Sequence, residues 1–133
     1  MIDDAITNVR RRGGIHIDIG GEGRYFNAIN LNPSEIGTSG SQIPDLVLGV
    51  GEQLPFRTKS ADFITLENTP IRPGASEGIA RVIKPGGQIL LFHPTVYAVD
   101  GGAHQRVVDA VGGVVEQIHH ADGMTTTIII APR

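Results

Sequence analysis

Apolar and polar residues alternate along this chain in short runs that are separated by turns rich in glycine and proline. Near the start, three isoleucines alternate with His16 and Asp18, and this period of two in β-branched residues predicts a strand over 15–19. Similar short runs predict six further strands, over 28–31, 45–50, 60–66, 88–93, 114–119 and 125–131. The run 89–92 is apolar throughout, which is typical of a strand covered on both faces of a parallel sheet.

Three stretches carry apolar residues at the spacing of an amphipathic helix. The first covers 1–12, with acidic residues at its start and arginines at its end. The second covers 75–83 and is ended by Pro85, and the third begins at Asp100 as N-cap and runs to about Val111. Strands that alternate with helices predict a single α/β domain over 1–133 with a mostly parallel sheet. The last two strands, joined by Asp122-Gly123, are expected to form an antiparallel hairpin.

The connection between the first two strands is unusually short. Eight residues, 20–27, separate them, whereas a parallel crossover usually takes a dozen or more residues and contains a helix. Either the crossover is a bare extended loop, or the two strands pair antiparallel. Residues 33–44, rich in Ser, Gly and Thr, are expected to form a loop, with room for one helical turn near 34–36.

Composition restricts the classes of function. The net charge is −3, and the longest basic run is three arginines at 10–12, so nothing indicates a track for a nucleic-acid backbone. Cysteine is absent, which rules out disulfides, thiolate metal sites and a cysteine nucleophile, and which fits a reducing cytoplasm. No apolar run approaches the roughly 18 residues of a membrane span. The neighbours His119 and His120 would point to opposite faces of a strand, so a shared metal is not expected.

A glycine-rich turn, Gly20-Gly21-Glu22-Gly23, follows the first strand directly, and Asp18 stands just before it. Glycine lets the backbone turn sharply and lets a ligand approach it closely. An acidic side chain before such a turn, at the carboxyl end of a parallel strand, indicates a nucleotide or nucleoside site. A tight loop that holds no ligand is the alternative.

Three later segments resemble motifs of the class I S-adenosylmethionine-dependent methyltransferases, and most closely those of the small-molecule type. They are GVGEQLPF at 49–56, SADFITLEN at 60–68 and ARVIKPGGQILL at 80–91. With IDIGGEG before them, the resemblance covers residues 15–92 in the family's order, and it implies a Rossmann-like sheet with S-adenosylmethionine as cofactor. Two departures stand out, because Glu22 replaces a glycine of the family pattern, and the helical cover expected after the first and second strands is reduced.

The resemblance also implies a set of site residues. Those expected to contact the cofactor are Asp18, Gly20, Gly21, Gly23, Asn30, Gly51, Glu52 and Leu54. Asn30, with Asn32 as substitute, stands where the family has an acidic residue that accepts both ribose hydroxyls, and an amide is not a bidentate anionic acceptor. Because ligands sit at the carboxyl ends of parallel strands, His93 is the first candidate for a general base, and Glu67 is the second.

Three functions remain open. The first is a compact methyltransferase that binds S-adenosylmethionine and methylates an unidentified acceptor. The second is a binding or interaction module that kept the sheet and lost the cofactor, which Asn30 and Val50 favour because they replace acidic residues. The third is an effector domain of a larger toxin-like protein. Missing helices should expose apolar surface on the first three strands, so a homodimer or another protein partner is expected to cover it.

Overall fold

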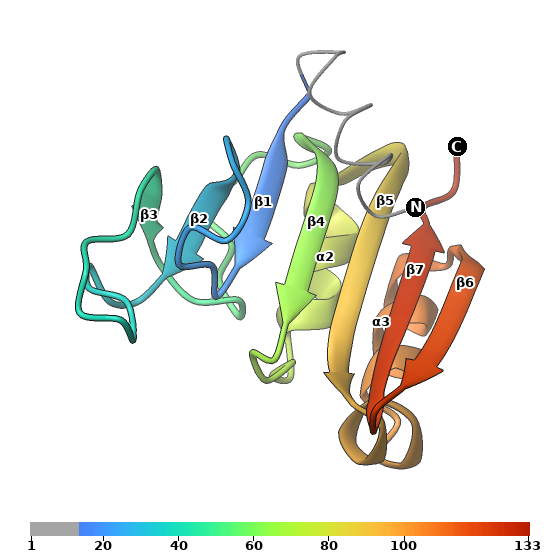
Figure 1. The fold of residues 1–133 in the computed structure, drawn as a ribbon. Coiled ribbons are helices and arrows are strands. Elements are labelled where there is room, and N and C mark those ends of the chain that lie inside the picture. Colours follow the sequence, from blue (N-terminus) through green and yellow to red (C-terminus); the bar gives the residue numbers. More distant parts are fainter. Residues whose placement is uncertain (1–13) are drawn as a thin grey trace.

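The computed structural model describes residues 14–133, and the helix expected over 1–12 lies outside the described residues. The strands are β1 (His16–Ile19), β2 (Ile29–Asn32), β3 (Leu46–Leu48), β4 (Ala61–Glu67), β5 (Ile83–Pro94), β6 (Val114–Ala121) and β7 (Met124–Ile130). They form one sheet in the order β3-β2-β1-β4-β5-β7-β6 (Figure 1). Strands β1 to β5 are parallel, and β7 runs antiparallel to its neighbours β5 and β6. The strand order reverses between β1 and β4, which makes their carboxyl ends the topological switch point of the sheet.

The expected strands are all present, and their ends differ by a few residues from the expected ones. β1 and β2 pair in parallel, with Ile17 opposite Ile29, so the bare extended loop is the correct alternative and antiparallel pairing is wrong. β5 begins at Ile83 rather than at 88, because the turn 85–87 is absorbed into the strand as an irregularity of its pairing with β4. The hairpin is confirmed, and Asp122 and Gly123 have the positive φ, 54° and 74°, that its tight turn requires.

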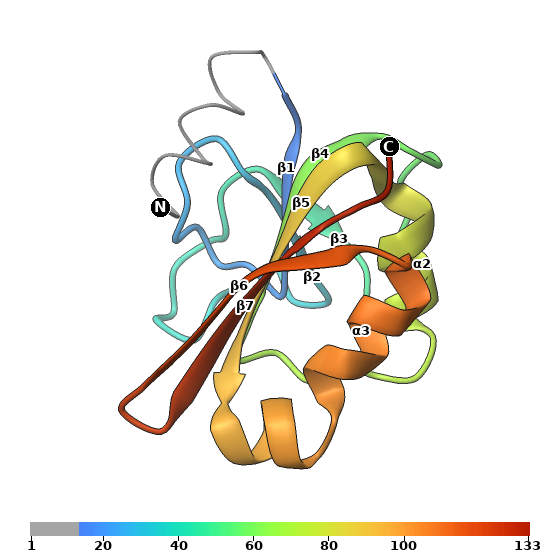
Figure 2. The ribbon, with the colours of Figure 1, turned by 90° about the vertical axis from the view of Figure 1, so that its right-hand side faces the viewer.

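The described helices lie on one face of the sheet (Figure 2). They are α2 (Ala75–Val82), α3 (Ala103–Val111) and the π-helical turn η1 (Val96–Asp100). Asp100 ends η1 and does not cap α3, because Gly102, with a φ of 72°, occupies the cap position. Within 14–133, the connections from β1 to β2 and from β2 to β3 contain no helix, as the sequence predicts, and the turn near 34–36 forms a bridge from Ile36 to Gln42 instead.

Alternation along β1 and β2 decides which side chains each face receives. Ile17, Ile19 and Leu31 are buried in the core that includes α2 and α3. On the other face, polar side chains are buried instead, among them Asp18 and Asn30. The expected exposure of apolar surface is therefore wrong for Ile17, Ile19 and Leu31, because these side chains pack in the core with the helices, whereas Ile15, just before β1, is 39% exposed. Leu48 of the edge strand β3, 55% exposed, does fit it. A homodimer or another partner stays a prediction.

Candidate functional site

A pocket of about 170 Å³ lies at the carboxyl ends of β1 to β4. Its apolar floor comes from Ile19, Leu31, Leu66 and Ala75. The segments that follow the four strands supply the walls, with Gly20, Pro33, Gly49, Val50, Gly51, Glu52, Thr69, Pro70 and Arg72. This position is the switch point of the sheet, where open α/β folds bind their ligands.

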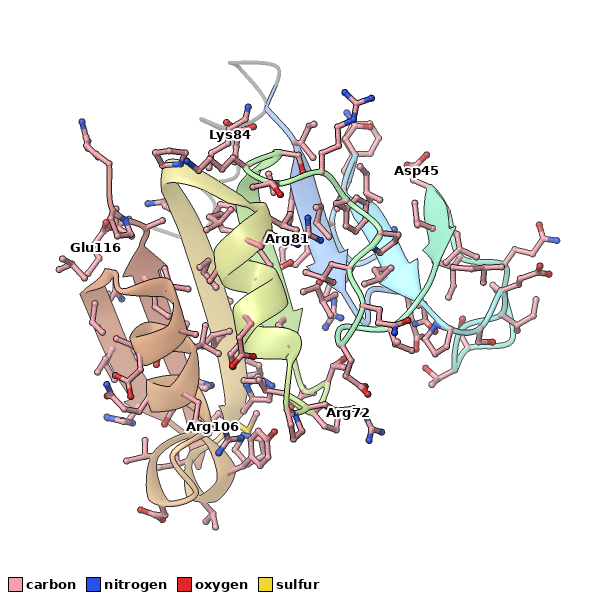
Figure 3. All side chains as sticks on the ribbon, turned by 180° about the vertical axis from the view of Figure 1, so that it is seen from behind. Asp45, Arg72, Arg81, Lys84, Arg106 and Glu116 are labelled. Atoms are coloured by element: carbon pink, nitrogen blue, oxygen red, sulfur yellow. The ribbon has the colours of Figure 1, made fainter. Side chains whose placement is uncertain are left out.

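Glu52 and Arg72 are the charged residues that line the pocket. Their side chains are 42% and 66% exposed, and 3.3 Å separates Arg72 Nε from Glu52 Oε1. Figure 3 shows Arg72 extending away from the loop that precedes α2. An ion pair this exposed contributes little to stability, so both groups can be used for binding. The sequence predicts Glu52 as a site residue and gives no local signal for Arg72.

Asp18 is wholly buried, on the face of β1 opposite the pocket floor, and it does not line the pocket. Its Oδ1 accepts a hydrogen bond from Thr65 Oγ1 at 2.8 Å, and its Oδ2 accepts one from Arg24 Nε at 2.9 Å. Burial raises the pKa of Asp18, and the Arg24 guanidinium opposes that rise. Arg24 also donates to the carbonyls of Gly20 and Glu67, so it holds the loop 20–28 across the ends of β1 and β4.

Asn30 is likewise committed to the fold. Its Oδ1 accepts from the Gly23 amide at 3.2 Å, and its Nδ2 donates to the Pro44 carbonyl at 2.8 Å. Gly21 lies directly against this polar pair, because a Cβ there would clash with Asn30 Oδ1 and would be 2.7 Å from Asp18 Oδ2. The conformation around Asn30 therefore requires glycine at 21 for reasons of packing, without reference to a ligand.

Glu22, which departs from the family's glycine pattern, also has a structural role. Its Oε1 accepts hydrogen bonds from the amide and the hydroxyl of Thr38, at 2.8 and 2.9 Å. Glu22 thereby ties the loop 20–28 to the loop 33–44. Leu54, expected near the cofactor, is 7% exposed and packs in the core against Gly78 of α2. Of the predicted cofactor-binding residues, the structure brings Gly20, Gly51 and Glu52 together in the pocket.

The two candidate bases lie on opposite faces of the sheet. His93 is on the helical face, is 1% exposed, and its Nε2 donates to the Thr69 carbonyl at 2.8 Å. Glu67, at the end of β4, is half-buried and accepts a hydrogen bond from the Tyr25 hydroxyl. Burial and this carboxylate raise the pKa of Tyr25. Neither candidate lines the pocket.

Among residues 14–133, no cluster of three or more His, Cys, Asp or Glu side chains could hold a metal ion. No helix described there is long and apolar enough to cross a membrane.

No protein-family model and no curated protein sequence matches the chain. Solved structures do resemble it. A 16S rRNA (adenine(1408)-N(1))-methyltransferase from Catenulisporales acidiphilia, solved with the cosubstrate SAM, is 15% identical over 98% of this chain and 92% of its own, with a TM-score of 0.63. A SAM-dependent methyltransferase from Thermotoga maritima is 16% identical over 97% and 87%, with a TM-score of 0.66.

A third structure is a complex between the Haloferax volcanii Trm112 methyltransferase activator and a methyltransferase, and it is 16% identical over 99% of this chain and 96% of its own, with a TM-score of 0.64. At such identities the likeness concerns the fold. At that level it confirms the resemblance that the sequence motifs indicate.

Proposed function

We propose that this chain, which has the fold of the class I S-adenosylmethionine-dependent methyltransferases, binds S-adenosylmethionine in the pocket at the carboxyl ends of β1 to β4 and transfers its methyl group to an acceptor. One observation carries this proposal. In a sheet of this topology, the switch point holds a pocket with an apolar floor and a carboxylate, Glu52.

The pocket residues fit the adenosine part of the cofactor. Ile19, Leu31 and Leu66 offer an apolar floor for a flat base. A carboxylate can accept hydrogen bonds from two ribose hydroxyls, and Glu52 supplies one inside the pocket. Asn30 cannot do this, since it is buried and its amide is already paired. We therefore assign the ribose contact to Glu52.

The size of the pocket limits how much of the cofactor it encloses. Pockets for drug-sized ligands measure roughly 300–1,000 Å³, and this one measures about 170 Å³. The adenosine part would be enclosed, and the methionine part would lie at the open rim. Asp18 is turned away from that rim and is occupied by Arg24 and Thr65.

When bound, S-adenosylmethionine supplies a methyl group that its sulfonium has already activated. The chain therefore has to orient the two reactants and exclude water, and it needs no nucleophile of its own. His93 is unsuited to be a general base, because it is buried and its Nε2 proton points at a carbonyl oxygen. Glu67 is not assigned as the base either, because it lies on the face of the sheet opposite the pocket floor and accepts a hydrogen bond from Tyr25, so the acceptor's proton is released to water.

Replacing Glu52 by glutamine is expected to weaken binding of S-adenosylmethionine about tenfold to a hundredfold. A hydrogen bond to a charged group is worth about 1.5–3 kcal/mol, and the exposed ion pair with Arg72 adds little to stability. Calorimetric titration of the purified chain with S-adenosylmethionine and with S-adenosylhomocysteine measures both affinities. Wild-type binding in the micromolar range is the expected reference.

Glu116→Gln is the matched control, because Glu116 is exposed on β6, at the opposite edge of the sheet from the pocket. Its affinity should equal that of the wild type. An equal loss in both variants would contradict the assignment of Glu52 and would indicate an effect of net charge. No heat and no thermal shift at millimolar ligand would contradict the proposed function itself, and would favour the module that has lost its cofactor.

A further inference from the structure

One wall of the pocket is the segment 69–71, between β4 and α2. Thr69 and Pro70 line the pocket, and Thr69 packs so tightly against Gly20 that a Cβ on Gly20 would lie 2.8 Å from Thr69 Cβ. Side chains from the end of β5 and from η1 hold this segment. His93 donates to the Thr69 carbonyl, and the Ile71 amide donates to the hydroxyl of Tyr97 in η1 at 2.8 Å.

A chain of hydrogen bonds begins at the Thr69 carbonyl and runs through His93 and His104 to Thr127. Because a carbonyl can only accept, His93 carries its proton on Nε2. A neutral His93 then accepts at Nδ1, which lies 2.8 Å from His104 Nε2, so His104 donates there. His104 Nδ1 accepts in turn, from the hydroxyl of Thr127 at 2.7 Å. With both rings neutral, this is the sole arrangement of protons in which every group is satisfied.

The surroundings favour the neutral form of both rings. His93 and His104 are 1% and 5% exposed. Burial lowers the pKa of His93, and burial together with His93 lowers the pKa of His104 to about 4. The other groups around them are the Tyr97 ring, the uncharged Thr125 and Thr127 of β7, and Glu67, whose charge opposes the shift of His93 without cancelling it.

We propose that Thr127, His104 and His93 form a positioning relay that holds the 69–71 wall against Gly20, and that the wall loosens when the two rings become charged. One proton added at His104 Nδ1 reverses the hydrogen bond between His104 and Thr127 and places a charge in the core. A second proton is incompatible with the geometry, because His93 Nδ1 and His104 Nε2 would both donate across 2.8 Å. Both histidines are positioning residues. The effect on ligand affinity rests on the proposed function, whereas the effect on the 69–71 wall does not.

The direction of the pH dependence follows from the lowered pKa values. In the unfolded chain both rings titrate near the ordinary 6.5, whereas in the folded chain they titrate lower. Between pH 6.5 and about 4 the unfolded state therefore binds more protons, and stability falls as the pH falls through that window. Above about pH 6.5 both rings are neutral in the folded and in the unfolded chain, so they add no pH dependence to the stability.

The first test is NMR of the imidazole nitrogens in the whole chain. At a pH above the ordinary histidine pKa, we expect slowly exchanging protons on Nε2 of both His93 and His104. Neither Nδ1 should carry a proton. A proton on either Nδ1 under these conditions would overturn the relay.

The second test is hydrogen exchange at the Ile71 amide, corrected for the intrinsic effect of pH. On acidification from about pH 7 to pH 5, wild-type exchange at the Ile71 amide should accelerate about tenfold. His93→Leu, which lacks the donor, should exchange fast at both pH values. His93→Gln keeps an uncharged N–H donor and should exchange slowly at both.

His119→Gln is the control, since His119 is exposed on β6, and it should keep the wild-type pH dependence. Wild-type exchange rates in His93→Leu would overturn the proposal. The affinity for S-adenosylhomocysteine should fall on acidification in the wild type and not in His93→Gln. If neither cofactor form binds at any pH, the proposed function fails, while the NMR and exchange results still decide for or against the relay.

Discussion

Arg24→Ala is expected to lower the free energy of unfolding by about 3 kcal/mol at neutral pH. The substitution leaves Asp18 fully buried with Thr65 as its remaining side-chain partner, and removing one member of a buried ion pair costs about 3–5 kcal/mol. The lower end applies because the Arg24 side chain is 34% exposed. Urea unfolding of both proteins measures the difference.

The loss should also depend on pH in a defined direction. Burial already raises the pKa of Asp18, and without the guanidinium it rises further. An acid with a higher pKa in the folded state binds more protons there, so stability falls as the pH rises from 3.8 through the folded pKa. Arg24→Ala should therefore lose less stability at about pH 5 than at about pH 8.

Two further variants separate the buried charge from other effects. Adding Asp18→Asn to Arg24→Ala removes the unpaired charge and should recover most of the loss at high pH. Arg106→Ala is the control, because Arg106 is an exposed residue of α3 that hydrogen-bonds to the Gly101 carbonyl, and it should stay within about 0.5 kcal/mol of the wild type. Equal losses for Arg24→Ala at both pH values would show that Asp18 is not their source.

Gly20→Ala is expected to cost about 2–5 kcal/mol, clearly more than Gly123→Ala. The two glycines have nearly the same φ, 75° and 74°, so alanine meets the same backbone strain of about 1–2 kcal/mol at both. At Gly123 nothing lies within 4 Å of the added Cβ, whereas at Gly20 the side chain of Thr69 occupies its place. Overpacking of this kind adds about 1–3 kcal/mol.

Thermal or urea unfolding of the two variants isolates the clash from the backbone strain. Thr69→Ala in the Gly20→Ala background removes two of the three clashing atoms and should restore part of the difference. Equal costs at the two glycines would mean that the Thr69 wall moves aside without penalty. That result would contradict the proposal that His93 and Tyr97 hold this wall in place.

The strands could be predicted from the sequence because a period of two marks each of them, and the parallel sheet followed from their alternation with helices. The direction in which β1 and β2 pair could not be predicted, because the alternation of apolar and polar residues is the same in parallel and in antiparallel pairs. The same limit applied to Asp18. Its place opposite Ile17 and Ile19 was readable from the alternation, but not which face of the sheet would carry the pocket.

The groups that shape the pocket were the hardest to predict, because they come from loops and from distant elements. Arg72 lies in a loop whose path depends on its contacts with the rest of the fold. His104 and Thr127 are 11 and 34 residues beyond His93, on α3 and β7. No local spacing links these three residues, so the sequence indicated His93 alone, and as a general base rather than as a residue that holds the segment 69–71.

The direct step from β1 to β2 has a consequence for the order in which the domain can fold. Ile17 and Ile29 pair across a short loop, and short loops close fast and at small entropic cost. Asp18 meets Thr65 across 47 residues, so joining β1 to β4 is a slower, non-local step. The pocket spans that junction. A partly folded chain could therefore already contain the β1–β2 pair and still lack any surface to which a ligand could bind.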